Sequence, residues 1–211
     1  MNPEYRRLFD EPLDRTNTHC LKWDAREAFF GDPCALPMWV ADMDFRAPQE
    51  VTDEICERAR HGAFGYEWKD PEHSAAAAEW LFDRHGLRAE PQWILTSQGV
   101  VASLHAAVGA LTQPGDKVVV PSPVYGPFFS AVTGEGRELV TCSMAWENGR
   151  WEMDLNRVEE ALRDGGRMLL VCNPHNPLGR VWTREELEAL SGLCRRYGAV
   201  LVSDEIHSDF I

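Results

Sequence analysis

Short apolar runs, separated by stretches of helical periodicity, are the feature that most constrains how this chain of 211 residues can fold. The clearest runs lie at 118–120, within a predicted strand at 117–120, and at 168–172 and 199–202. Runs this short and continuously apolar are typical of strands that are buried on both faces of a parallel sheet. The alternation of strands and helices therefore predicts an α/β fold, with three α/β/α layers around a mostly parallel sheet.

Turn and capping residues place the remaining elements of this fold. Asn148-Gly149 predicts a hairpin over 146–153, and Asp154 is the expected N-cap of a helix. Thr183 and Glu186 have the spacing of a capping box at the start of another helix. Further strands are expected at 93–96 and 137–142. Helices are expected over these segments: 48–61, 71–85, 102–111, 155–162 and 184–197.

The N-terminal part of the chain lacks this alternation. Residues 1–36 are polar, contain three prolines and show only a weak apolar period, so we expect an irregular segment that is either an N-terminal arm held by its surroundings or disordered. The aromatic Trp23, Phe29 and Phe30 favour an arm that packs. Residues 36–45 are apolar and then alternate with acids, which fits either a short strand or an extended crossing over a groove.

Composition narrows the range of partners. The formal net charge is −13, which argues against a nucleic-acid partner because such proteins usually carry basic patches. We expect no membrane span and no signal peptide. The six cysteines show no metal-ligand spacing, so we expect no metal site. Cysteines inside apolar runs are typical of a reducing compartment, which predicts a cytoplasmic protein.

Polar residues follow the predicted strands at the ends where α/β proteins bind ligands. Asp204, Glu205 and His207 follow the last run directly, and in open α/β sheets such strand ends face the ligand crevice. The alternative is that these acids only cap a following turn. Gly99 stands between a predicted strand and a helix, where backbone N–H groups can bind phosphate. Many turns of this kind bind nothing, so both interpretations stay open.

Two proline-rich turns follow the other strands. Residues 122–127 place Tyr125 after a Pro-x-Pro sequence, and the Ser122–Pro123 bond is a candidate for the cis form. The alternative for Tyr125 is a core position after a rigid turn. Residues 173–180 contain two Asn-Pro dipeptides and a glycine, which predicts an ordered turn. A loop that only connects two elements does not need these residues, so we expect the turn to have a further role.

In this order and spacing, these segments resemble the fold-type I pyridoxal-phosphate enzymes of the class I/II aminotransferase superfamily. Within that superfamily the chain is similar to the MalY/PatB group of cystathionine β-lyases, or C–S lyases. The resemblance covers essentially the whole chain and implies an aminotransferase-like large domain. It rests on these segments: 22–24, 36–45, 62–66, 122–127, 173–179 and 203–207. It also implies a division into 1–47, an arm and small-domain segment, and 48–211, the cofactor-binding large domain.

The resemblance implies roles around the ring of pyridoxal 5'-phosphate. Asp204 would pair with the protonated pyridine nitrogen, which keeps the ring an electron sink. Asn176 would donate a hydrogen bond to the phenolic oxygen, and His207 would lie near that same oxygen. Tyr125 would stack on the face of the pyridine ring.

It also implies contacts to the phosphate and to the substrate. Gly99, Val100 and Val101 would lend backbone N–H groups to the phosphate. Tyr66 would reach the phosphate in a partner subunit, which implies a homodimer with shared sites. Ala41 would lie beside the substrate.

The chain departs from the family pattern at the lysine that holds the cofactor as a Schiff base. Its three lysines are Lys22, Lys69 and Lys117, and none lies in the Ser-x-Ser-Lys context of the family. The resemblance places that segment, and the arginine that binds the substrate carboxylate, after Ile211. It thus predicts an N-terminal half, truncated before the lysine and lacking two sheet strands, which contains no catalytic residue and is inactive alone.

Three functions remain open at this point. The leading hypothesis is a C–S β-lyase that eliminates a thiol from a small sulfur amino acid and releases pyruvate and ammonia. His207 and the segment 38–45 favour it. The second is an aminotransferase on the same fold, because a fold does not fix a function. The third, favoured by the missing lysine, is a non-catalytic cofactor-binding or dimerising remnant.

Overall fold

A computed structural model describes residues 3–211 of the protein, with side chains from Arg6 onward. The chain divides into two compact units, Met1–Trp68 and Lys69–Ile211. The boundary that the family resemblance implies between 47 and 48 stays a prediction.

The second unit is built on a parallel sheet. Its strands are β1 (Lys117–Ser122), β2 (Glu138–Ser143), β5 (Gly166–Cys172) and β6 (Val200–Asp204). They lie in the order β2-β1-β5-β6, and each neighbouring pair is parallel. Val119 of β1 lies opposite Val140 and Leu169, and Cys172 of β5 lies opposite Asp204 of β6. The predicted parallel sheet is therefore confirmed.

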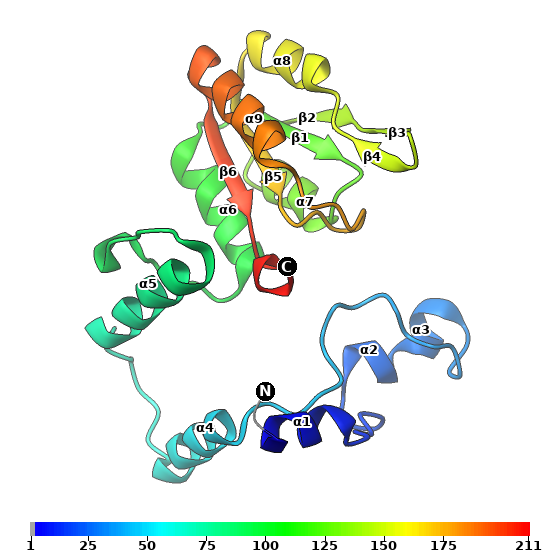
Figure 1. The fold of residues 1–211 in the computed structure, drawn as a ribbon, viewed down its shortest axis with the longest axis vertical. Coiled ribbons are helices and arrows are strands. Elements are labelled where there is room, and N and C mark those ends of the chain that lie inside the picture. Colours follow the sequence, from blue (N-terminus) through cyan, green and yellow to red (C-terminus); the bar gives the residue numbers. More distant parts are fainter. Residues whose placement is uncertain (1–2) are drawn as a thin grey trace. The chain divides into compact units, whose positions relative to one another are not determined.

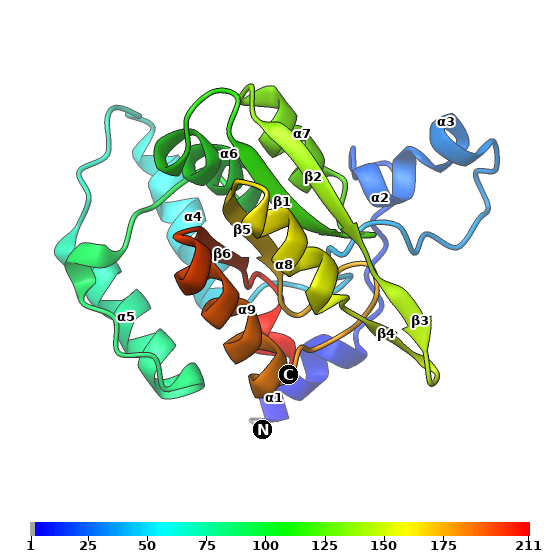
Figure 2. The same ribbon diagram turned by 90° about the horizontal axis from the view of Figure 1, so that it is seen from above.

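Helices cover both faces of this sheet, as Figures 1 and 2 show. On one face the helices are α6 (Val100–Leu111) and α7 (Pro127–Gly134), and on the other α8 (Leu155–Arg163) and α9 (Arg184–Tyr197). Leu170 of β5 packs in the core with α6 and α7, whereas its neighbours Leu169 and Val171 pack in the core with α8 and α9. Side chains alternate between the faces of a strand, so β5 contributes to both cores. The three-layer α/β/α arrangement is confirmed.

Local sequence signals explain where several elements begin. The Asp154 side chain accepts the N–H groups of Asn156 and Arg157 at the start of α8, and Thr183 and Glu186 form the predicted capping box of α9. The predicted hairpin is also present, as the antiparallel strands β3 (Ala145–Glu147) and β4 (Arg150–Glu152). Between them Asn148 and Gly149 have φ angles of 52° and 78°, as a tight hairpin turn requires.

Three predictions for this unit were wrong or incomplete. Residues 93–96 form no strand: a 3₁₀ turn, η1 (Pro91–Trp93), ends there, and Leu95 is 88% exposed and pairs with no strand among the described residues. The run at 199–202 is a strand, but β6 lies at an edge of the described sheet, so it is only partly buried. Helix α7 was not predicted, although Pro127 stands at its first turn.

Helix α5 (Pro71–His85) belongs to the same unit and begins and ends as predicted, with the N-cap Asp70 and the C-cap Gly86. Its C-terminal half is held to a short 3₁₀ turn, η2 (Ser208–Phe210). Asp209 of that turn lies 2.9 Å from His85 Nε2 and also accepts the indole N–H of Trp80. Side-chain hydrogen bonds therefore tie the end of the chain to α5.

The first unit contains three helices within residues 1–36, where an irregular arm was expected. They are α1 (Pro3–Asp10), α2 (Leu21–Asp24) and α3 (Arg26–Phe30). The helix predicted for 48–61 is present as α4 (Gln49–His61). The aromatic residues pack as expected, since the Trp39 ring lies 4.9 Å from Phe29 and 5.3 Å from Phe30, centroid to centroid. Residues 36–45 form no strand and are irregular, with bends at 39, 44 and 45.

Two glycines give a test of the packing between α8 and the sheet. A Cβ on Gly166 would lie 2.8 Å from Val119 Cγ2 and 3.0 Å from the Ala161 carbonyl oxygen. We predict that Gly166→Ala destabilises the protein by roughly 1–3 kcal/mol through overpacking. Gly192 in α9 is the matched control, because a Cβ there meets nothing within 4 Å. Gly192→Ala should stabilise by about 0.5–1 kcal/mol in urea unfolding; similar effects of both substitutions would contradict this account.

Candidate functional site

The candidate site lies at the carboxyl edge of the sheet, where three strand ends are tied together. The loop after β5 is bound to the end of β6, because the Asn173 N–H donates to the Asp204 carbonyl oxygen at 2.9 Å. The same loop is bound to the loop after β1, because the Tyr125 N–H donates to the Asn176 carbonyl oxygen at 3.0 Å. The structure therefore brings together three of the segments that carry the predicted site residues.

Residues 173–182 form an ordered turn, as the sequence predicts. The Asn173 side chain accepts the Trp182 N–H at 3.1 Å, and the Trp182 indole donates to the Cys172 carbonyl oxygen at 2.9 Å. Within the turn, the His175 N–H donates to the Arg180 carbonyl oxygen at 2.6 Å. The peptide bonds Asn173–Pro174 and Asn176–Pro177 are cis. The Ser122–Pro123 bond, the predicted candidate for this form, is also cis.

Arg180 holds this turn to its surroundings. Its Nε donates to the Trp151 carbonyl oxygen of β4 at 2.8 Å, and its guanidinium forms an ion pair with Glu186 of α9. The guanidinium carbon also lies 4.6 Å from the Trp182 ring centroid, a cation–π contact. The turn is thus fixed from both the hairpin and the helix.

Asp204 is the acidic group of the site and is only 7% exposed. Its Oδ1 accepts the Ile206 N–H at 3.1 Å, so the turn-capping interpretation is correct for one oxygen. The other carboxylate oxygen, Oδ2, accepts no hydrogen bond from residues 6–211. No basic side chain in that range forms an ion pair with Asp204. Buried carboxylates are normally paired. An unpaired one fits a cationic group of a ligand.

The start of α6 supplies a partial positive charge. Gly99 is its N-cap, and no side chain caps the helix there, so the first backbone N–H groups at Val100 and Val101 are available to an anion. The φ angle of Gly99 is 87°, a conformation that favours glycine. Because α6 leads into the amino end of β1 and contacts β6, its own start faces the carboxyl edge of the sheet.

The other predicted side chains of this unit are at least partly accessible. Tyr125 is exposed, and Asn176 and His207 are half-buried. The His207 ring lies 6.4 Å from that of Phe210, centroid to centroid. Carboxylate, amide, imidazole, phenol and helix N-terminus together match the charge and hydrogen-bonding pattern of pyridoxal phosphate. The donor set therefore fits that cofactor, while the role of each residue stays a prediction.

Tyr66 and Ala41 lie in the first unit, so their roles also stay predictions. Ala41 lies in the segment 36–45. Two acidic residues close to it, Asp42 and Asp44, belong to an ion-pair cluster that was not predicted from the sequence. Arg15 binds Asp42 at 2.7 Å and Asp44 at 2.8 Å, and Lys22 Nζ binds Asp44 at 2.7 Å. The alternating acids of this segment were the available signal.

The lysines have other contacts. Lys22 is buried in that ion-pair cluster. Lys69 Nζ donates to the Ile94 carbonyl oxygen. Lys117 starts β1 and therefore lies at the amino edge of the sheet, opposite to the site, with its Nζ 3.2 Å from the Asp164 carbonyl oxygen. This geometry argues against Lys117 as a cofactor-binding lysine.

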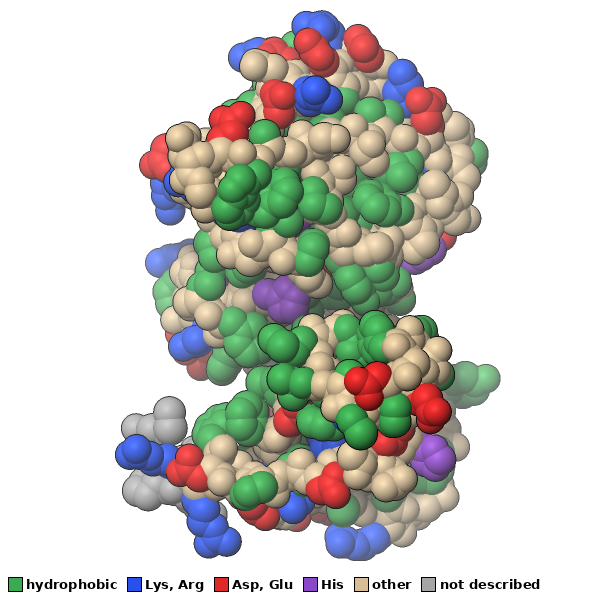
Figure 3. Space-filling model, turned by 90° about the vertical axis from the view of Figure 1, so that its right-hand side faces the viewer, with side chains coloured by type: hydrophobic (Ala, Val, Ile, Leu, Met, Phe, Trp, Pro, Cys, Tyr) green, Lys and Arg blue, Asp and Glu red, His purple; other side chains and the backbone are tan. Residues whose placement is uncertain are grey.

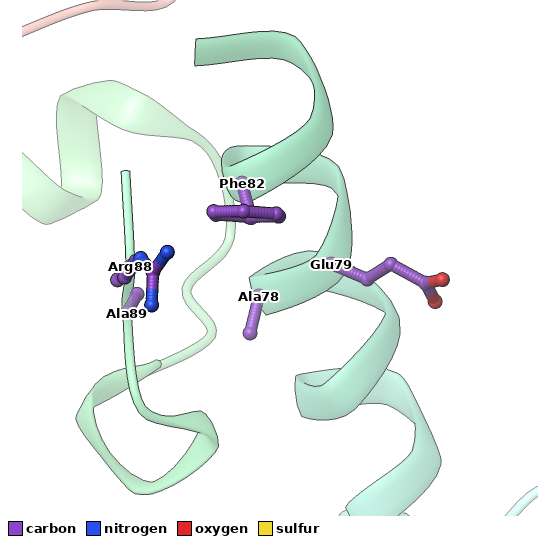
Figure 4. A pocket seen from close by; sticks show the side chains of 5 residues that line it. All are labelled: Ala78, Glu79, Phe82, Arg88 and Ala89. Atoms are coloured by element: carbon purple, nitrogen blue, oxygen red, sulfur yellow. The ribbon is translucent and has the colours of Figure 1, made fainter. Parts of the chain in front are cut away.

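A surface hollow of about 360 Å³ lies away from the predicted residues, between α5 and the segment that follows it (Figure 4). Phe82 and Ala78 line it, and the Arg88 guanidinium lies 5.2 Å from the Phe82 ring centroid. Apolar side chains also reach the surface elsewhere (Figure 3). At the site edge the exposed ones include Val101 and Ile206.

Comparison with known proteins identifies the family. The model of the family described as "Aminotransferase class I and II" matches residues 40–211. The chain is 45% identical over 204 residues to cystathionine beta-lyase PatB of Bacillus subtilis (strain 168), covering 96% of this chain and 53% of that protein. Since the family model spans most of the sequence, the chain belongs to the class I and II aminotransferase family.

Solved structures agree with this assignment. A PLP-bound putative aminotransferase from Clostridium difficile 630 superimposes with a TM-score of 0.89 and 37% identity, covering 95% of this chain and 52% of that one. The PLP-bound C–S lyase from Staphylococcus hominis superimposes with a TM-score of 0.84 and 32% identity, covering 94% and 51%. The chain spans about half the length of the curated relatives it matches. No helix among the described residues has the length and apolar character needed to span a bilayer.

The ion-pair cluster of Arg15, Lys22, Asp42 and Asp44 predicts that the stability of the first unit depends on pH. Lys22, with Trp23 and Arg15, lowers the pKa of Asp44 to about 2. A depressed carboxyl pKa contributes stability above the unfolded pKa, near 3.9, that is lost as the pH falls towards 2. Thermal unfolding of the first unit should therefore shift to lower temperature over this range.

The substitution Asp44→Asn should remove most of that pH dependence and lower the melting temperature at pH 7. Glu57→Gln is the control, because Glu57 is exposed on α4 and forms no ion pair within the described chain. An unchanged acid profile in Asp44→Asn would contradict the assignment.

Proposed function

We propose that this chain is the pyridoxal-phosphate-binding portion of a C–S β-lyase that acts on a small sulfur amino acid. The observation that carries the proposal is the buried carboxylate of Asp204, which has no basic partner among residues 6–211 and lies at the carboxyl edge of the sheet. The similarity to PatB, a cystathionine beta-lyase, and to a PLP-bound C–S lyase supports it.

The residues at this edge would divide the work of holding the cofactor. Asp204 would hold a positive charge on the ring nitrogen, because a buried carboxylate strongly favours a neighbouring cation. Asn176 would donate to the phenolic oxygen, and Tyr125 would cover one face of the ring. The first N–H groups of α6 would bind the phosphate. When bound, the cofactor supplies an electron sink for the carbanion formed at the substrate Cα.

Aminotransfer is the second candidate, and the similarity to a putative aminotransferase at 37% identity favours it. Both reactions begin with loss of the Cα proton and then differ in what leaves. Release of pyruvate from cystathionine would support the lyase, whereas amino transfer to a 2-oxo acid would support the alternative. The assay belongs to the whole protein, because the chain spans about half the length of the relatives that support the proposal.

We further propose that the protein works as a homodimer in the cytoplasm. Tyr66 would reach the phosphate of a partner subunit, and its side chain is fully exposed in the first unit. A fully exposed tyrosine is available for such a contact. Light scattering of the protein with and without pyridoxal phosphate would test the assembly, and a monomer under both conditions would contradict it.

Substitution of Asp204 tests the site by binding alone. Asp204→Asn keeps the shape of the side chain and removes its charge. We predict that the dissociation constant for pyridoxal phosphate, from absorbance titration, rises roughly tenfold to a hundredfold, since a hydrogen bond to a charged group contributes about 1.5–3 kcal/mol.

Glu205→Gln is the matched control, because Glu205 is the exposed neighbour and accepts the Ser203 hydroxyl instead. It should bind the cofactor within about twofold of the unsubstituted chain, as expected for a surface substitution of less than 0.5 kcal/mol. Equal losses in the two variants, or no loss in Asp204→Asn, would contradict the proposed site.

A further inference from the structure

We propose that His175 is a positioning residue of the cofactor site. Its imidazole latches the loop after β1 to the turn after β5, and so holds Tyr125 and Asn176 in register at the sheet edge. The inference rests on the proposed function for its purpose, while the latch itself rests on the geometry of this chain.

The latch consists of two hydrogen bonds that join the same two loops. His175 Nε2 lies 2.8 Å from the Pro123 carbonyl oxygen, and a carbonyl only accepts, so Nε2 donates. Two residues further along the first loop, the Tyr125 N–H donates to the Asn176 carbonyl oxygen at 3.0 Å. The two hydrogen bonds lie close together along both loops. Loss of the bond from His175 to Pro123 should therefore weaken the neighbouring bond from Tyr125 to Asn176.

Several backbone groups at the centre of the turn are unavailable as donors to Pro123, since the Asn176 N–H interacts with the Cys172 thiol. Pro174 and Pro177 have no N–H group. The N–H of His175 is already committed to the Arg180 carbonyl oxygen at 2.6 Å. In this structure the donor to the Pro123 carbonyl oxygen is the imidazole and not a backbone N–H of the turn.

The ring is held neutral and in one orientation. His175 is 3% exposed, and its ring lies edge-on to Trp182 at 5.5 Å between centroids. Burial lowers the pKa of His175 and outweighs the backbone groups of Pro123 and Cys172, which raise it, so the uncharged form prevails at pH 7. With its proton on Nε2, Nδ1 is a bare acceptor, and it is buried without a partner among the described residues.

A buried acceptor without a partner is costly for a purely structural histidine. Leaving such a group unsatisfied incurs its full desolvation penalty, and an apolar side chain of similar size would avoid that penalty. What the apolar side chain would lack is the donor to Pro123. The chain therefore keeps a residue that is expensive for the core and useful for the relation between two site loops.

Two variants separate the latch from simple packing. His175→Leu fills the space without a donor, whereas His175→Gln retains an amide N–H at about the place of Nε2. The two quantities to measure are the rate of hydrogen exchange at the Tyr125 amide and the dissociation constant for pyridoxal phosphate. In His175→Leu, exchange at Tyr125 should be about tenfold faster and binding about tenfold weaker; His175→Gln should recover most of both.

Exchange at the buried amides of β1 and β5 serves as the internal reference. Unchanged Tyr125 exchange in His175→Leu relative to that reference, or equal defects in both variants, overturns the latch. If His175→Leu does not fold, the ¹⁵N spectrum of the unsubstituted chain decides: a ring protonated on Nδ1 at pH 7 overturns the proposal, and the Nε2–H tautomer supports it. Failure of the unsubstituted chain to bind pyridoxal phosphate overturns the proposed function instead, and with it the positioning role.

Discussion

The pairing of β5 with β1 on one side and β6 on the other is the interaction on which the second unit depends. Both faces of β5 are buried, so a shift of one residue in its register would exchange the side chains that face the two helical layers. This register sets Cys172 beside Asp204 and brings the ends of the strands level. The site loops can then exchange backbone hydrogen bonds, which hold them to one another.

The same edge carries polar groups that the described residues leave without a partner. Asp204 is 7% exposed and has no basic partner in the described residues, and His175 keeps a buried nitrogen unsatisfied. A buried nitrogen of this kind destabilises a core unless a ligand or a neighbour compensates for it. The concentration of these polar groups beside an uncapped helix N-terminus is what distinguishes this edge from an ordinary end of a sheet. In contrast, the ion pairs around Asp44 are satisfied and stabilise a segment of the first unit.

The sequence predicted those parts of the fold that local signals determine. Continuous apolar runs located β1 and β5, and capping residues located α8 and α9. The same signals failed where pairing decides the outcome. Residues 93–96 have the composition of a strand but pair with no strand among the described residues. The sequence of β6 is typical of a strand buried on both faces, whereas β6 lies at an edge of the described sheet.

The candidate site was predictable in its residue types, and the resemblance to a known family supplied the roles. Its supporting contacts were not predictable, because they join residues far apart in the chain. The hydrogen bond from His175 to Pro123 and the ion pair of Arg15 with Asp42 depend on how loops meet after folding. Spacing along the sequence carries no signal for such contacts, whereas capping and turn geometry are local.

The measurement that tests the central claim most directly is a map of backbone amides on addition of pyridoxal phosphate, by hydrogen exchange or amide chemical shifts. The account predicts changes at the start of α6, at Tyr125, in the turn after β5 and at the end of β6. It predicts no change at the amino edge of the sheet around Lys117. Changes confined to that edge, or to the hollow beside α5, would contradict the assignment of the cofactor to the carboxyl ends of the strands.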